Sequence, residues 1–189
     1  MPKIDTSSVP ARTGSGYPAP FDEPCAARTR RRVGDAGGLR DFGVNLMTLP
    51  PGGWSSQRHW HSHEDEFVYL LEGELALIED GSETVLLAGD CATFPKGTGN
   101  GHHLINKSSA TAVYLEVGSR NPHDLTTCSD IDMMSSNADG RFVHKDGAAY
   151  HSRAVSRPPT NISHLHKGAK SDDESHWFSR SALVGAARL

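Results

Sequence analysis

The sequence predicts an all-β protein, a sandwich or barrel of antiparallel strands. Eight short apolar or alternating runs follow one another between residues 44 and 118, each bounded by turn residues. Short strands at this spacing are typical of antiparallel sheets that pack on each other or close into a barrel. No helical pattern interrupts the runs, so a parallel sheet with crossover helices is not expected.

The strand-forming runs can be placed in chain order. They are VNLMTL (44–49), RHWHSH (58–63), EFVYLLEG (66–73), ELALIED (74–80), ETVLLAG (83–89), DCATFP (90–95), HHLINK (102–107) and ATAVYLEVG (110–118). Pro50-Pro51-Gly52-Gly53 marks a sharp turn into the second run. Asp80-Gly81 predicts a two-residue hairpin turn between the fourth and fifth runs, because this pair tolerates the positive φ angles that such a turn requires.

The chain length of 189 residues fits one domain with extensions. Residues 1–41, which begin with a stretch rich in Ser, Thr, Pro and Gly, are expected to form an N-terminal arm, and residues 42–120 the β-barrel core. The runs weaken after residue 120. Residues 121–150 are therefore expected to be an extended segment that packs on the barrel, and residues 151–189 a weakly structured polar tail.

Composition excludes several classes of partner. The net charge of −4 gives no broad basic field, so a nucleic-acid partner is not expected. No apolar run approaches the roughly 20 residues that span a bilayer, and the N-terminus lacks an apolar signal core. The three cysteines are far apart and without CxxC spacing, which argues against a disulfide framework and against a thiolate zinc site. A cytoplasmic protein is expected.

The stretch QRHWHSHEDEF (57–67) is the densest cluster of chemically active side chains. Side chains two apart on a strand share a face, so His59, His61 and His63 lie on one side. Two imidazoles from one strand can occupy adjacent positions around a divalent ion, and a carboxylate from the next strand, here Glu66, can supply a third ligand. A fourth ligand is expected from the distant pair His102-His103.

These residues resemble the two conserved motifs of the cupin superfamily. The first motif is matched at every spacing by Gly53, His59, His61, Glu66 and Gly73. The second is matched by Gly89, Pro95, Gly97, His102 and Asn106, with four residues instead of two between Gly97 and His102. The resemblance implies a double-stranded β-helix, the jelly-roll barrel of cupins. It also implies one divalent metal ion held by His59, His61, Glu66 and His102. The flanking sequences are similar to bacterial single-domain cupins, some of them labelled sugar-phosphate isomerase-like.

Two alternatives remain open within the motifs. The insert before His102 leaves His103 as a rival fourth ligand, although the spacing to Asn106 favours His102. His63 replaces His59 if the register shifts, although the spacing from Glu66 to Gly73 favours the first assignment. Gln57, which shares strand parity with His59, and His63 are the candidate substrate-binding residues.

Two further groups fall outside the motifs. The basic run RTRRR (28–32) is expected on a solvated or subunit-facing arm, with binding of an anionic substrate as the alternative. His164 and His166 form a second His-x-His, but no carboxylate lies at motif spacing, so they are assigned to the polar tail.

The expected function is that of a metal-dependent enzyme of isomerase, epimerase or lyase type. Its metal, which the sequence does not distinguish among Zn, Mn, Fe and Ni, would act as a Lewis acid on a small polar or sugar-like substrate. The alternatives are an iron-dependent dioxygenase and a non-catalytic cupin that binds or senses a small molecule. The family resemblance also suggests a homodimer. No catalytic base can be assigned from the sequence.

Overall fold

A computed structural model describes residues 3–150 as an almost entirely β structure. Its strands are β1 (Ala11–Thr13), β2 (Thr29–Arg31), β3 (Phe42–Leu49), β4 (His59–His61), β5 (Glu66–Glu72), β6 (Glu74–Glu79), β7 (Ser82–Leu87), β8 (Cys91–Phe94), β9 (His103–Ile105), β10 (Ala112–Ser119), β11 (Leu125–Cys128), β12 (Met134–Ser136) and β13 (Phe142–Val143). The helical elements of this part are a 3-10 turn, η1 (Glu23–Cys25), and the one-turn α1 (Val33–Ala36). Each of the eight predicted runs overlaps one strand, so the predicted all-β fold is confirmed.

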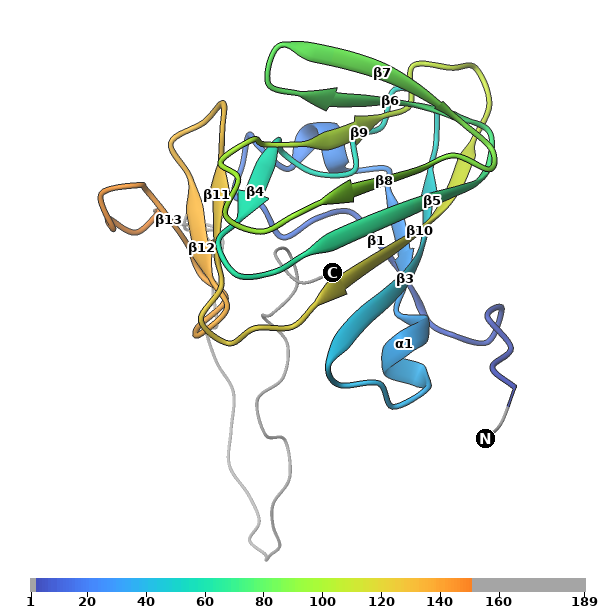
Figure 1. Cartoon of the computed structure of the whole chain (residues 1–189), viewed down its shortest axis with the longest axis horizontal. Helices are drawn as coiled ribbons and strands as arrows, with labels where there is room; N and C mark the ends of the chain where they lie inside the picture. The colour runs from blue at the N-terminus through green and yellow to red at the C-terminus, as the bar shows by residue number, and fades with distance from the viewer. Residues whose placement is uncertain (1–2, 151–189) are drawn as a thin grey trace, which may run out of the picture.

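One wall of the barrel is a six-stranded antiparallel sheet in the order β1-β2-β3-β10-β5-β8 (Figure 1). Its centre is the long pair β3 and β10, which stay in register from Leu49 opposite Ala112 to Phe42 opposite Ser119. Along β3 every second residue is buried, the alternation of a strand with one face on a core. This wall therefore has a defined inner face.

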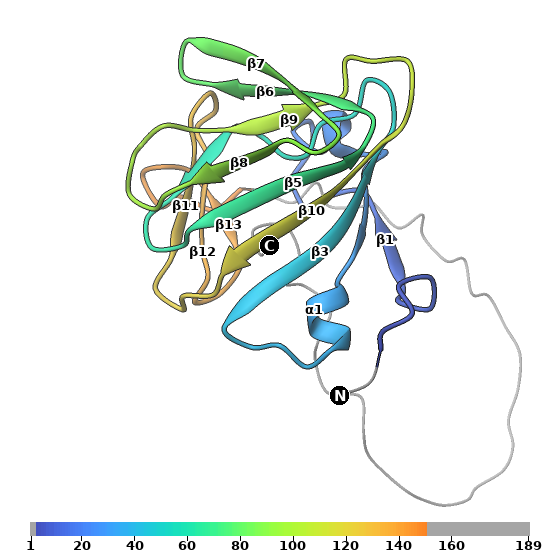
Figure 2. The same ribbon diagram turned by 45° about the vertical axis from the view of Figure 1, so that its right-hand side comes forward.

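The opposite wall is made of a four-stranded sheet, β13-β12-β11-β4, and a three-stranded sheet, β7-β6-β9. Antiparallel bridges between His59 and His102 and between Trp54 and Ile105 join these two sheets. Figure 2 shows β11, β12 and β13 at one end of the barrel and β6, β7 and β9 at its top. The two walls enclose a core of buried aliphatic and aromatic side chains, among them Met47, Leu70, Leu75 and Tyr114.

The predicted Asp80-Gly81 hairpin is confirmed. β6 and β7 pair from Glu74 opposite Leu87 to Glu79 opposite Ser82, and Gly81 has a φ of 72°. Gly73, between β5 and β6, has a φ of 84°, and a Cβ there would lie 3.0 Å from Ala112 Cα. Glycine is therefore required at residue 73 both by conformation and by the close approach of β10.

The segments on either side of the core take part in the sheets. In residues 1–41, β2 hydrogen-bonds to β3, with Arg30 opposite Met47. In residues 121–150, β11 pairs with β4, with Thr126 opposite His61. The proposed tail, residues 151–189, and its His164 and His166 lie outside the described residues.

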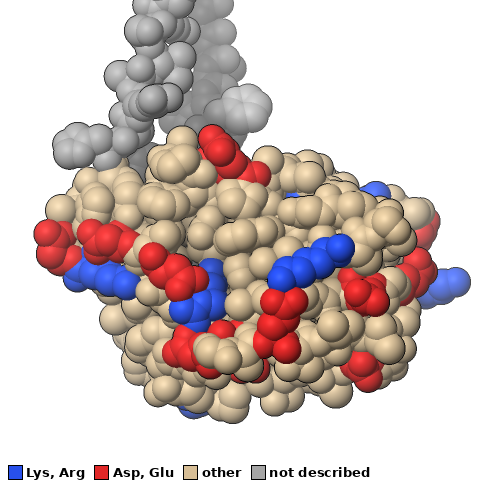
Figure 3. Space-filling model, turned by 90° about the horizontal axis from the view of Figure 1, so that it is seen from above, with Lys and Arg blue, Asp and Glu red and all other residues tan. Residues whose placement is uncertain are grey.

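Charged side chains on the visible surface are mixed. The face seen in Figure 3 carries acidic and basic side chains interspersed, without a continuous field of either sign. Among the residues that the structure describes, no helix is long and apolar enough to cross a membrane.

Candidate metal centre

Two neighbouring strands carry the first three candidate ligands. His59 and His61 lie at the two ends of the short strand β4, which β11 holds by pairing Thr126 with His61 and Cys128 with His59. Glu66 is the first residue of β5 and lies opposite Phe94 of β8. Strand alternation therefore turns both imidazoles inward, while the turn over residues 62–65 brings the carboxylate back toward them.

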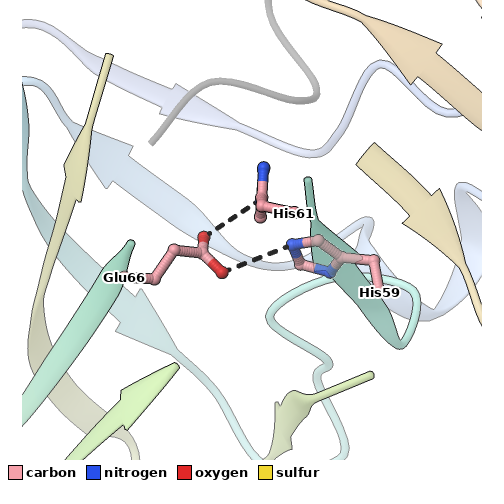
Figure 4. Close-up of side chains that lie close together, drawn as sticks. All are labelled: His59, His61 and Glu66. Atoms are coloured by element: carbon pink, nitrogen blue, oxygen red, sulfur yellow. Dashed lines mark ion pairs between the residues drawn. The ribbon is translucent and has the colours of Figure 1, made fainter. Parts of the chain in front are cut away.

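The Glu66 carboxylate points between the two imidazoles (Figure 4). Its Oε1 lies 3.3 Å from His61 Nε2, and its Oε2 lies 3.9 Å from His59 Nε2. One possible ligand atom from each of these three residues lies within 4.8 Å of the other two. The spacing suits three ligands of a single ion.

His102, rather than His103, joins this cluster. His102 Nε2 lies 2.8 Å from Glu66 Oε2, and the ring stacks on Phe94 at a centroid distance of 3.5 Å. The neighbouring His103 faces away: its Nδ1 lies 3.0 Å from the carbonyl oxygen of Ser56, and its ring meets Trp54 edge-on. The opposite directions follow from the alternation of side chains along an extended chain.

A second layer of polar groups fixes the imidazoles. Asp124, which is fully buried, places Oδ2 2.6 Å from His61 Nδ1. Its other oxygen accepts the backbone N–H of His63 at 2.7 Å. His59 Nδ1 lies 2.8 Å from the carbonyl oxygen of Gln57. Such bonds to the outer ring nitrogen set which nitrogen faces the ion and hold the ring in place.

The charges in the cluster are strongly coupled. Burial opposes a charge on His61, but the Glu66 and Asp124 carboxylates outweigh it and raise the pKa of His61 to about 10. Burial lowers the pKa of His59 to about 3, so this imidazole is neutral. Burial works against ionisation of Glu66, yet His61 and His102 hold its pKa well below the usual range. Glu66 is thus a buried carboxylate, the group that a cation would pair with.

The chemistry of the donor set tests whether a cation fits. The Glu66 carboxylate is buried among three imidazoles, with Oε2 2.8 Å from His102 Nε2 and Oε1 3.3 Å from His61 Nε2. A buried carboxylate needs a nearby positive charge, and a metal ion shared with the imidazoles supplies it. Neutral imidazole nitrogens together with one carboxylate form a donor set suited to a divalent transition metal. The residues present therefore fit such an ion.

A cavity of about 50 Å³ adjoins the cluster. Besides the four candidate ligands, its lining includes Arg28, Arg30, Tyr114, Glu116 and Ser135. The expectation that the basic run lies on a solvated arm is wrong for Arg28 and Arg30, which are only 6% and 8% exposed. Both are buried because β2 is hydrogen-bonded to β3 and turns alternate side chains of the run inward.

The two candidate substrate contacts lie outside this lining. Gln57 is buried, but its Nε2 donates to the carbonyl oxygen of Phe21 at 2.7 Å. His63 is exposed, and its Nδ1 lies 2.8 Å from the hydroxyl of Ser62. β4 ends at His61, so the alternation that aligns His59 with His61 does not continue to His63.

Asp124 is the part of the site that the sequence does not reveal. It lies 58 residues beyond Glu66 in a segment with little apolar patterning, so no local spacing connects it to the histidines. For the basic run the sequence leaves anion binding as the alternative to a solvated arm, because arginines on both faces of the run hide the inward direction of Arg28 and Arg30. Only the pairing of distant strands reveals these contacts.

Comparison with known proteins agrees with this architecture. Residues 45–118 match the Cupin domain family. A sugar phosphate isomerase of the cupin superfamily from Silicibacter pomeroyi is 45% identical, with a TM-score of 0.76, over 79% of this chain and 97% of that one. The chain therefore belongs to the cupin superfamily. A search of the curated proteins found no match.

Two more distant structures show how widely the fold is shared. An Acidithiobacillus ferrooxidans protein, provisionally named a sugar phosphate isomerase, is 28% identical over 67% of this chain and 81% of that one, with a TM-score of 0.60. The polyketide cyclase RemF from Streptomyces resistomycificus is 20% identical over 66% and 83% of the chains, with a TM-score of 0.52. The latter supports the fold alone, since one fold can host unrelated reactions.

Proposed function

We propose that this cupin is a metal-dependent enzyme of isomerase, epimerase or lyase type that acts on a small polar, sugar-like substrate. The observation that carries the proposal is the convergence of His59, His61 and His102 on the buried carboxylate of Glu66. The name of the 45% identical Silicibacter pomeroyi protein supports the substrate class. His59, His61, Glu66 and His102 are the proposed ligands.

The roles of the chain's own residues follow from their contacts. A divalent ion bound at these ligands supplies Lewis-acid polarisation of a carbonyl or hydroxyl group. Asp124 holds the His61 ring through Nδ1, and Phe94 stacks on His102, so the ligand set is preorganised. The barrel walls keep bulk water from the ligands, whose side chains are at most 12% exposed.

Glu116 is the proposed group for proton transfer. It lines the same cavity as the ligands and accepts a hydrogen bond from Asn45 Nδ2 at 3.1 Å. Burial raises the pKa of its carboxyl, against the opposing charges of Arg30 and Arg28. A carboxyl with a raised pKa beside the reacting group is the property expected of a general acid or base.

The decisive experiment begins with elemental analysis of the purified full-length protein. Exchange of the hydrogen next to the carbonyl of small aldoses and ketoses is then followed by NMR in D₂O, before chelation, after chelation and after metal is restored. We expect exchange to disappear on chelation and to return with the metal found. His61→Ala is expected to abolish it, whereas Asp130→Asn, which alters an exposed ion pair with Arg58, is expected to leave it unchanged.

Other outcomes would replace the proposal. Full exchange by a verified metal-free protein would remove the metal from the mechanism. Iron in the purified protein together with substrate-dependent oxygen consumption would identify a dioxygenase instead. Metal-dependent binding of a sugar without exchange or turnover would favour a binding or sensing role.

A further inference from the structure

The end of the cavity formed by β2 and β10 is unusually rich in buried positive charge. Arg28 and Arg30 lie two residues apart, so both reach the inner side of the sheet, and both line the cavity. The register places Arg30 opposite Met47 of β3, and Met47 opposite Tyr114 of β10. Arginine side chains are rarely buried unless an opposite charge accompanies them.

Glu116 is the acidic side chain whose charge opposes Arg30 and Arg28 at this end. Arg28 donates to the backbone carbonyls of Gly14 and Ser55, and among the described residues no carboxylate forms an ion pair with it. Among the residues that the structure describes, the carboxylates that line the cavity are Glu66 and Glu116. With the buried Asp124 carboxylate behind His61 counted as a third, the two guanidinium groups and a divalent ion at the ligands would leave one positive charge in excess. Buried excess charge favours an anion.

Two buried hydroxyl groups in the lining have unused hydrogen-bonding capacity. Tyr114 is 1% exposed and Ser135 is 2% exposed, and neither side-chain oxygen has a hydrogen bond of normal geometry, although the Ser55 side chain is close enough to Tyr114 to lower the pKa of the phenol. Burial, followed by the Glu116 charge, raises the pKa of Tyr114 well above its ordinary value, while Arg28 opposes the shift. The phenol is therefore protonated and can donate. Buried hydroxyl groups usually have hydrogen-bond partners, so free hydrogen-bonding capacity at a cavity wall indicates that a bound ligand supplies the partner.

The size of the cavity limits what can occupy it. Its volume of about 50 Å³ is room for about three to five water molecules. That is the size of a carboxylate or phosphate group and smaller than a complete sugar. A larger substrate would place only its anionic group here and leave the rest beside the metal ligands.

We propose that Arg28, Arg30 and Tyr114 form an oxyanion site that binds the carboxylate or phosphate group of the substrate. The inference rests on the proposed function, because the anion is placed in the cavity that the metal ligands share. It narrows the substrate class from polar sugar-like molecules to acidic ones, such as sugar acids or sugar phosphates. Arg30 lies on β2, Arg28 directly precedes this strand, and Tyr114 lies on β10, so the site lies apart from the cupin motifs.

The test measures anion binding rather than turnover. Full-length protein, metal-loaded and chelated, is titrated calorimetrically with inorganic phosphate, with glycolate and with the uncharged ethylene glycol. We expect phosphate or glycolate to bind and ethylene glycol not to bind, and the tighter of the two anions identifies the substrate's acidic group. Tyr114→Phe is expected to weaken that anion about 10-fold, the usual loss of a hydrogen bond to a charged group. Arg28→Gln is expected to weaken it further.

The variants separate a binding role from a structural one. Tyr114→Phe removes a hydroxyl whose hydrogen bonds lack normal geometry and whose side-chain neighbour is Ser55, so the melting temperature of the free protein is expected to change little. Arg31→Gln is the matched control: Arg31 is the neighbouring charge on β2, and it donates to the backbone carbonyl of Val9 on the other face. Anion affinity in this control is expected to equal that of the unaltered protein.

Three results would overturn the inference. They are failure of both anions to bind the metal-loaded protein, unchanged affinity in folded Tyr114→Phe and Arg28→Gln, and an equal loss in Arg31→Gln. The proposed function can fail separately. If the chelated protein still binds the anion, and the variants still weaken it, while no metal-dependent exchange is found, the oxyanion site stands and the metal-dependent reaction does not.

Discussion

Replacing Asp124 by asparagine tests the layer of the site that lies behind the ligands. The substitution keeps the shape of the side chain, and its amide oxygen can still accept the backbone N–H of His63, as Asp124 Oδ1 does at 2.7 Å. What changes is the partner of His61. A carboxylate oxygen 2.6 Å from His61 Nδ1 is replaced by a neutral amide, which no longer holds the imidazole in a single tautomer.

The size of the effect follows from this contact. A hydrogen bond to a charged group contributes about 1.5–3 kcal/mol, which corresponds to roughly 10-fold to somewhat over 100-fold in an equilibrium constant. Loss of a carboxylate behind a metal-binding histidine typically costs about 10- to 100-fold in metal affinity, which agrees with this estimate. We therefore expect Asp124→Asn to bind the metal about 10- to 100-fold more weakly than the unaltered protein.

The assay is a competition titration of chelated protein against a fluorescent chelator of known affinity, with the metal identified by elemental analysis. Asp130→Asn is the matched control, because Asp130 pairs with Arg58 at the surface and its side chain is 57% exposed. Exposed ion pairs contribute about 0–1 kcal/mol, and Asp130 touches no proposed ligand, so unaltered metal affinity is expected. Equal affinities of Asp124→Asn and the unaltered protein would refute the assignment of His61 as a ligand positioned by Asp124.

Three further predictions concern protons, backbone and assembly. Because His61 keeps its proton up to a pKa of about 10 and must lose it to bind a metal, metal binding near neutral pH should release a proton and strengthen as pH rises toward 10. Calorimetry in buffers of different ionisation enthalpy measures this release, and heats independent of the buffer would contradict it. In Gly73→Ala and in Gly81→Ala the new alanine must adopt a left-handed backbone conformation, which costs about 1–2 kcal/mol. Of the two, the alanine at residue 73 would also place its Cβ 3.0 Å from Ala112 Cα. Gly73→Ala should therefore lower the melting temperature more, and an equal or larger loss in Gly81→Ala would count against the contact. We also propose that the protein is a homodimer. Sedimentation equilibrium of the full chain measures its mass in solution, and a monomeric mass would contradict the proposal.

The parts of the fold that could be predicted from the sequence are those with a local physical cause. A hairpin turn needs residues that accept positive φ, and Asp80-Gly81 supplies them between two apolar runs. His59, His61 and Glu66 come together because a strand and the following turn fix their directions within eight residues of sequence. The resemblance to the second cupin motif, through the spacing to Asn106, favours His102 over His103, and the structure brings His102 to the cluster. In each case the residues concerned are close in sequence or lie on a strand with a clear alternating pattern.

The burial of Arg28 and Arg30 could not be predicted, for a different physical reason. Alternation identifies the inner face of a strand only when the two faces carry different kinds of residue, and RTRRR carries arginine on both. Pairing of β2 with β3 decides which arginines are buried, and no residue within the run records that pairing. Burying Arg28 and Arg30 is costly, and Glu116 is the lining carboxylate whose charge opposes theirs. Two arginines that a sheet turns toward a cavity thus favour anion binding over a solvated arm, a choice that the sequence alone leaves open.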